Sequence, residues 1–161
     1  MRKLAVRLTP DNQIEVTVGT ESRTGETYYL GMNINTLDAP EVDEELSERP
    51  IEGCIALVRE WLRLLIELRD GQQVFLPFDF SDEYTRWLTI RKEGREATAV
   101  LGWSTIEGWA ISPSNFQEHA HSLPEFTPDE PLHVQTFYLP QLLSNLRQSL
   151  MELQSPAHPK N

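Results

Sequence analysis

Cysteine, basic residues and long apolar runs are all scarce in this chain, and each scarcity narrows the possible chemistry. Cys54 is the only cysteine among 161 residues, so one chain can form neither an internal disulfide nor a cysteine-based zinc or redox pair. A single cysteine is compatible with a reducing cytoplasm, and we expect a cytoplasmic protein. On the apolar face of a predicted helix, its thiol should act as a small hydrophobe. A place in the first turn would nevertheless lower its pKa and leave some reactivity.

Long apolar runs are missing as well. The N-terminal segment alternates apolar and polar residues and stops at Pro10 without a continuous apolar stretch, so we expect no signal peptide. The most apolar stretch, residues 54–68, carries four charged side chains and is too short to span a bilayer. The sequence therefore predicts no membrane partner.

Basic residues are outnumbered, with 14 Lys and Arg against 25 Asp and Glu and a formal net charge of −11. Nucleic-acid binding draws most of its affinity from basic side chains that displace counterions from phosphates, so we expect no nucleic-acid partner. An acidic surface suits a basic protein partner, whose association it would accelerate by steering. The alternative is that the acidity only keeps the protein soluble.

Much of the negative charge is concentrated in one segment. Residues 38–52 hold seven carboxylates and one arginine directly before a long apolar-rich helix. A charged segment held beside a packed helix offers a partner an electrostatic surface. The residues of this segment that we expect to bind a basic partner are Asp38, Glu41, Asp43, Glu44, Glu45 and Glu48.

The spacing of apolar residues predicts an α+β fold in a single domain, residues 1–154, with a flexible tail at 155–161. Helical spacing predicts two long helices, at about 51–69 and 139–153. We expect both helices to pack on one face of an antiparallel sheet of about six to seven strands. The candidate strands lie at about 4–8, 14–18, 28–34, 73–80, 85–92, 96–104, 109–112 and 133–137. A capping box at 114–117 predicts a short helix through about residue 121.

Two Gly-Trp pairs, at 102–103 and 108–109, lie six residues apart on either side of Glu107. The favoured interpretation is that Trp103 and Trp109 are core aromatics at the end of a hairpin. The alternative is that they line a pocket or an interface, because tryptophan is enriched at binding hot spots. Glu107 would then add an acceptor for a basic ligand. We include all three residues among the candidate partner-binding residues.

His119 and His121 are the first candidates for metal binding. On a helix, two residues at this spacing diverge by about 200°, whereas a metal site needs three or four converging ligands. His133 is the one further histidine that could fold close to them. We therefore interpret them as half-exposed helix residues and expect no metal.

Asp79, Asp82 and Glu83 are the candidates for acid–base chemistry. Paired carboxylates divide acid and base roles only when burial raises the pKa of one of them. These three bracket a predicted strand end, where such side chains usually bond the local backbone. Motifs of hydrolases, nucleotide-binding loops and zinc peptidases are missing from the sequence. We expect no catalytic residues and no cofactor.

Together these features predict a non-enzymatic acidic binding protein that engages a basic macromolecule. In size, acidity and sheet-plus-helix layout the chain is similar, in a general way, to small bacterial immunity and inhibitor proteins. A toxin domain is one example of the basic partner that we expect. One alternative is a structural or self-associating subunit, such as a homodimer, with Trp103, Trp109 or the wide apolar helix face at a symmetric interface. A further alternative is a small enzyme or ligand-binding domain with a pocket near Trp103, Trp109 and His119.

Overall fold

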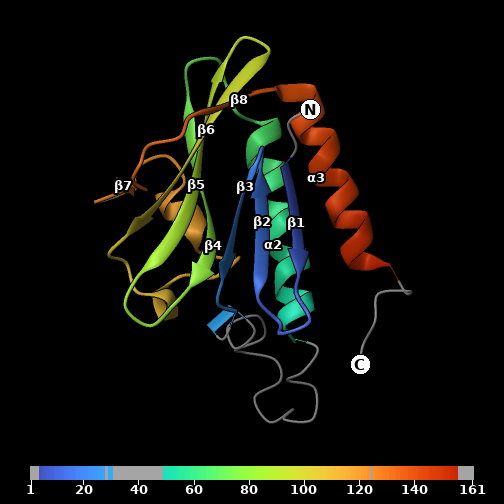
Figure 1. Cartoon of the computed structure of the whole chain (residues 1–161), viewed down its shortest axis with the longest axis vertical. Coiled ribbons are helices and arrows are strands. Elements are labelled where there is room, and N and C mark those ends of the chain that lie inside the picture. The colour runs from blue at the N-terminus through green and yellow to red at the C-terminus, as the bar shows by residue number, and fades with distance from the viewer. Residues whose placement is uncertain (1–3, 28, 31–48, 124, 156–161) are drawn as a thin grey trace.

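The computed structural model describes residues 4–27, 29–30, 49–123 and 125–155 (Figure 1). Its fold is α+β, which confirms the predicted class: two long helices accompany two antiparallel sheets. Sheet A has the order β1-β2-β3, and sheet B has the order β4-β5-β6-β7 with β8 also paired to β6. The strands are thus divided between two sheets rather than gathered in one. The predicted tail, 155–161, falls almost wholly outside the described residues.

The main elements have the following bounds. The strands are β1 Leu4–Leu8, β2 Ile14–Val18, β3 Glu21–Gly25, β4 Gln73–Phe80, β5 Thr85–Glu93, β6 Glu96–Ser104, β7 Thr127–Pro128 and β8 Gln135–Tyr138. The long helices are α2 Arg49–Ile66 and α3 Leu139–Gln154, and two short 3-10 helices are η2 Gly108–Ala110 and η3 Phe116–His119.

Sheet A is a meander of three five-residue strands. In β1 and β2 alternate side chains are buried, as their period-two patterns predict. The prediction for the third strand is wrong in part: β3 occupies 21–25, where a polar turn is expected, and residues 29–30 of the expected strand are helical. Gly19, with φ 65°, makes a tight turn into β3. Backbone pairing with β2 holds β3 although its side chains are polar.

Sheet B begins with β4, an outer strand that is nevertheless buried on both faces. Seven of the eight residues of β4 are buried. This burial is expected, because apolar residues occupy both alternating sets of positions in the strand. The register of β4 against β5 shifts between Pro77 and Asp79, where the proline interrupts regular pairing. The predicted strands at 85–92 and 96–104 are confirmed as β5 and β6, which pair throughout as a hairpin and turn at Gly94, where φ is 66°.

Sheet B is covered on both faces. Ala99 and Leu101 on one face lie opposite Val18 of sheet A. On the other face Phe75 packs edge-to-face on Phe126, with ring centroids 5.2 Å apart. The segment that covers this second face contains η2 and η3 instead of the predicted strand at 109–112 and the predicted capped helix. The Asn115 side chain explains the second difference, because Oδ1 accepts the Ser112 N–H and does not cap η3.

The two long helices pack on sheet A and on each other (Figure 1). α2 buries Trp61 completely and contacts β1, β4 and α3. α3 runs along β1, the outer strand of sheet A, and supplies the hydrogen-bond partners that this strand edge would otherwise lack. Asn145 Oδ1 accepts the Leu4 N–H at 3.2 Å, and Ser149 Oγ accepts the Val6 N–H at 3.0 Å. Sheet A therefore has no open edge on this side.

Candidate functional site

The six carboxylates predicted to bind a partner in the acidic segment lie outside the described residues: Asp38, Glu41, Asp43, Glu44, Glu45 and Glu48. The described residues that flank this segment lie next to each other. A β-carbon on Gly53, in the first turns of α2, would lie 2.8 Å from Leu30 Cγ. Leu30 and Gly53 are both buried. Residue 30 therefore packs against the first turns of α2.

Several short segments meet at that end of the molecule, which is the lower end in Figure 1. The Thr27 hydroxyl donates to the Asn12 carbonyl in the β1–β2 turn. Tyr29 Oη donates to Asp82 Oδ1 at 2.6 Å, so the β4–β5 turn lies beside residues 29–30. The Gly108 N–H donates to the Ser81 carbonyl at 2.7 Å and places η2 against the same turn.

These segments expose six carboxylates, which we call the acidic end: Asp11, Glu26, Glu52, Asp82, Glu83 and Glu107. No Lys or Arg in the described part of the chain forms an ion pair with any of them. The described Lys and Arg residues therefore leave these six charges without an ion-pair partner. The sequence placed Glu107 in a binding surface and Glu52 in the acidic segment, whereas Asp82 and Glu83 were considered only for acid–base chemistry. Asp11 and Glu26 were not singled out. The sequence indicates which segments form turns, but it does not show that these turns lie side by side in the fold.

Trp103 and Trp109 are 38% and 57% exposed. The favoured prediction, that both are core aromatics, is therefore wrong. The glycines explain the exposure at η2: a β-carbon on Gly108 would lie 2.3 Å from the Ser81 carbonyl oxygen. The backbone of η2 thus lies directly on the end of β4, and its tryptophan is left on the outside. Tyr84, which sequence reasoning missed, is 41% exposed in the neighbouring turn.

Asp79 is a buried carboxylate that supports this end of the fold. It is 4% exposed, and its Oδ1 accepts the Glu26 N–H at 2.9 Å and the Ser81 hydroxyl at 2.7 Å. Burial raises the pKa of Asp79 above its ordinary value, against the opposing effects of those two hydrogen bonds and of Arg86. A hydrogen bond to the local backbone is expected of a carboxylate at a strand end. Asp79 instead accepts a backbone N–H from Glu26, just after β3, and a side-chain hydroxyl from its own turn.

Cys54 is fully buried in α2. Burial raises the pKa of its thiol to about 12. The expectation that the first turn of the helix would lower this pKa is therefore wrong, because loss of hydration outweighs the helix dipole at a completely buried site. The other prediction, that Cys54 behaves as a small hydrophobic side chain, agrees with this complete burial.

The three histidines considered as metal ligands do not converge. His121 Nδ1 lies 3.0 Å from the Gln73 carbonyl oxygen, whereas His133 lines a hollow with Val18 on the opposite face of sheet B. The described residues contain no group of three or more His, Cys, Asp or Glu side chains that could hold a metal ion.

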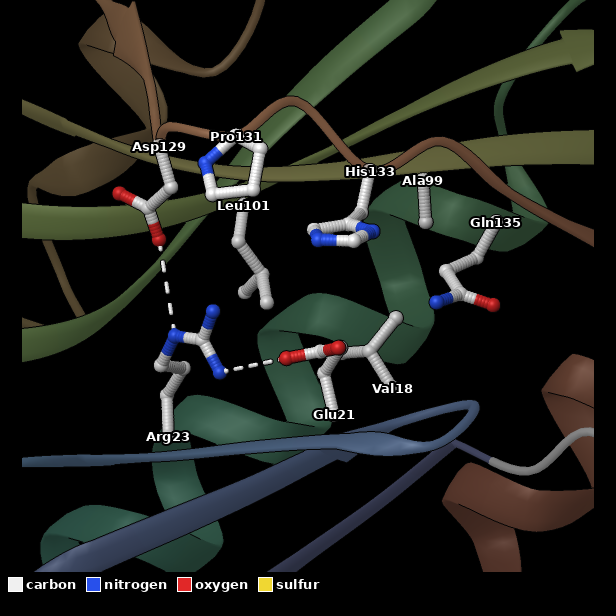
Figure 2. Close-up of a pocket in the computed structure, with 9 residues that line it drawn as sticks. All are labelled: Val18, Glu21, Arg23, Ala99, Leu101, Asp129, Pro131, His133 and Gln135. Atoms are coloured by element: carbon white, nitrogen blue, oxygen red, sulfur yellow. Dashed lines mark hydrogen bonds and ion pairs between the residues drawn. The ribbon is translucent and has the colours of Figure 1, made fainter.

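That hollow lies between the two sheets (Figure 2) and holds about 10 Å³, room for about one water molecule. Arg23 of β3 bridges it, with Nη1 3.0 Å from Glu21 and Nε 3.6 Å from Asp129. Arg86 also contacts Asp129, at 3.0 Å. These ion pairs link sheet A to sheet B and act as a structural connection.

A larger hollow of about 510 Å³ lies along α2 between Arg59, Arg63 and Ser114. Glu60 beside it accepts from Arg63 Nη2 and Gln117 Nε2, and the Arg63 hydrogen bond lowers the pKa of the Glu60 carboxyl. Neither this hollow nor the one between the sheets is lined by the residues of the pocket hypothesis. The tryptophans and His119 are therefore not gathered around either of these hollows.

Comparison with known proteins found no matching family model, no matching curated protein and no matching solved structure. Among the described residues, no helix combines the length and the apolar character that crossing a membrane requires. The site must therefore be interpreted from its own geometry.

Proposed function

We propose that the chain is a non-enzymatic binding protein of the cytoplasm that engages a basic macromolecular partner, such as a toxin-like protein domain. The contact surface consists of the acidic end, the acidic segment that joins it, and the aromatic side chains exposed beside it. The observation that carries the proposal is the position of Trp109. This large exposed side chain lies two residues after Glu107, and the Gly108 N–H between them donates to Ser81 in the turn that carries Asp82 and Glu83.

The chemistry of this surface favours a cationic partner. Six exposed carboxylates that form no ion pair among the described residues create a negative field that steers basic molecules toward them. Exposed aromatic side chains then offer flat surfaces on which arginine and lysine can stack. Charge would determine the association rate, and burial of Trp109 would determine how long the complex lasts.

Hydrogen bonds hold the described turns of this surface to one another, as a preformed binding surface requires. Asp79, Tyr29 and Gly108 tie the turns of the acidic end to β4 by direct hydrogen bonds. A partner would therefore lose little free energy in ordering the turns that it contacts.

The proposal is tested by affinity capture from the native cell at low salt, with the bound proteins identified by mass spectrometry. One variant combines Asp43→Asn, Glu44→Gln, Glu45→Gln and Glu48→Gln. A matched control removes the same number of charges at exposed sites remote from the acidic end, by Glu67→Gln, Glu93→Gln, Glu96→Gln and Glu130→Gln. The expected result is a basic protein that the wild type and the control both retain and the variant loses.

Salt provides an independent check on the same captured protein. Exposed charges are screened beyond about 8 Å at physiological ionic strength, so the complex should elute as salt is raised. The proposal is wrong if no basic protein is captured, or if the variant captures it as well as the wild type does.

A further inference from the structure

The strand β8 is an open edge of sheet B. It pairs with β6 on one side, and no other described strand pairs with it. Two other outer strands, β1 and β4, are covered. α3 side chains accept the free N–H groups of β1, and the N–H groups of Phe75 and Phe80 in β4 donate to the carbonyls of Ala120 and Glu26. An edge without such cover is a template for another strand.

The orientation of the β8 backbone follows from the register. The Leu139 N–H donates to the Arg95 carbonyl at 2.7 Å, so the pairs Phe137↔Ala97 and Gln135↔Ala99 also exchange hydrogen bonds with β6. In an antiparallel ladder the intervening residues point their N–H and C=O groups the other way. The backbone groups of Val134, Thr136 and Tyr138 therefore face outward.

The same residues expose apolar side chains. Val134 is 54% and Tyr138 is 50% exposed, and Leu132 just before them is 59% exposed. Residues 131–146 contain no Asp, Glu, Lys or Arg, in a chain with 39 such residues. Protein edge strands usually carry charges that prevent pairing, and β8 itself carries no Asp, Glu, Lys or Arg. The charged neighbours at its end are Arg95, whose Nη1 donates to Tyr138 Oη at 3.3 Å, and Glu96, which lies opposite Tyr138 in β6.

We propose that β8 pairs with β8 of a second copy of this chain in an antiparallel, two-fold symmetric dimer. An uncharged edge is the place where two molecules of net charge −11 can approach with least repulsion. The strand is also self-complementary: with Thr136 on the symmetry axis, Val134 of each copy lies opposite Tyr138 of the other. Aromatic and β-branched residues form favourable cross-strand pairs, and every outward backbone group in this register has a partner.

The interface is small. Burying the strand edge and its three exposed apolar side chains removes roughly 800–1,000 Å² from the two copies together, below the ~1,200–2,000 Å² of a stable standard interface. The dimer is therefore weak and depends on protein concentration. It uses a surface remote from the acidic end, so one dimer would present two acidic ends.

Sedimentation velocity of the full chain from about 1 to 200 µM tests the dimer. The wild type should shift from monomer to dimer across this range. Thr136→Lys, which places two like charges opposite each other on the axis, should weaken the dimer at least about tenfold. Ser144→Lys adds the same charge at an exposed site on α3 and should leave it unchanged. A wild type that stays monomeric throughout, or a dimer that Thr136→Lys does not weaken, overturns the proposal.

Crosslinking tests the register. In the proposed dimer the two copies of residue 136 form a hydrogen-bonded pair with Cα atoms about 5.5 Å apart, within disulfide range. Thr136→Cys should therefore give a disulfide-linked dimer under mild oxidation, whereas Ser144→Cys should not. The native Cys54 is buried and does not compete. Equal crosslinking of both variants would show collision without the proposed pairing.

Discussion

Asp79 Oδ1 accepts the backbone N–H of Glu26 at 2.9 Å, and this bond joins the end of β3 to the end of β4. The carboxylate is buried, so it is a hydrogen-bond acceptor for the scaffold and not part of the exposed acidic surface. The structure thus separates two kinds of acidic residue at the same end of the molecule. One buried carboxylate holds the turns together, and the exposed ones present charge.

Asp79→Asn should raise the free energy of unfolding relative to the wild type, by an amount that increases with pH through the acid range. Because burial raises the pKa of Asp79 in the folded state, its stabilising contribution is present at low pH and is lost as the pH rises through that raised pKa. Asn keeps the Oδ1 acceptor and does not ionise. Urea unfolding at several pH values measures the difference; a difference that is constant with pH would contradict the account.

Asp79→Ala should instead destabilise the protein at every pH. It removes the acceptor of two hydrogen bonds and leaves the Glu26 N–H without a partner, which costs about 1–3 kcal/mol. Denaturant unfolding at neutral pH measures the loss. Stability equal to that of Asp79→Asn would show that the hydrogen bonds contribute nothing.

Cys54 should not react with thiol reagents in the folded protein at about pH 8. Its pKa of about 12 leaves almost no thiolate, and the side chain is fully buried. Reaction with an aromatic disulfide reagent, followed by absorbance, should begin only when denaturant unfolds the chain. Modification in native buffer at the rate of a free cysteine would contradict the burial of this thiol.

Ser149→Ala should destabilise the fold by about 1–3 kcal/mol, because the Val6 N–H in the outer strand of sheet A would lose its acceptor. Ser144→Ala provides the matched control, since Ser144 is exposed on the same helix. Chemical unfolding of both variants compares them directly. Equal effects would show that α3 does not cover the β1 edge through this bond.

Gly108→Ala should destabilise the protein by about 1–3 kcal/mol, because its β-carbon would overlap the end of β4. Trp109→Ala, one residue further on, should cost less than about 1 kcal/mol despite its larger change in volume, since Trp109 is 57% exposed. Thermal unfolding of both variants measures which of them loses more stability. The reverse order would place Trp109 in the core.

Elements with strong periodicity could be predicted from the sequence. Both long helices, the first two strands and the β5–β6 hairpin follow from apolar spacing and from the glycine at residue 94. β3 could not be predicted because its polar side chains carry no pattern; backbone pairing to β2 and the ion pair of Arg23 with Asp129 hold it in place. The exposure of Trp109 depends on how η2 packs on β4, which is a tertiary contact.

The candidate surface was predictable only in part. The acidity near residue 38 and the unusual position of Glu107 are visible in the sequence. The place of Asp82 in the acidic end depends on its hydrogen bond with Tyr29, which lies 53 residues earlier in the sequence. No local sequence pattern indicates that contact. The open edge at β8 is likewise a property of the sheet order, which apolar spacing does not determine.

The most direct test of the account measures how fast the captured basic partner associates with two charge variants. Asp82→Asn, Glu83→Gln and Glu107→Gln together remove exposed carboxylates from the acidic end, and Glu67→Gln, Glu93→Gln and Glu96→Gln remove three at exposed sites remote from it. At low salt the first variant should associate about tenfold more slowly than the wild type, and the second should match the wild type. Equal rates for all three proteins would contradict the claim that this end of the molecule binds the partner.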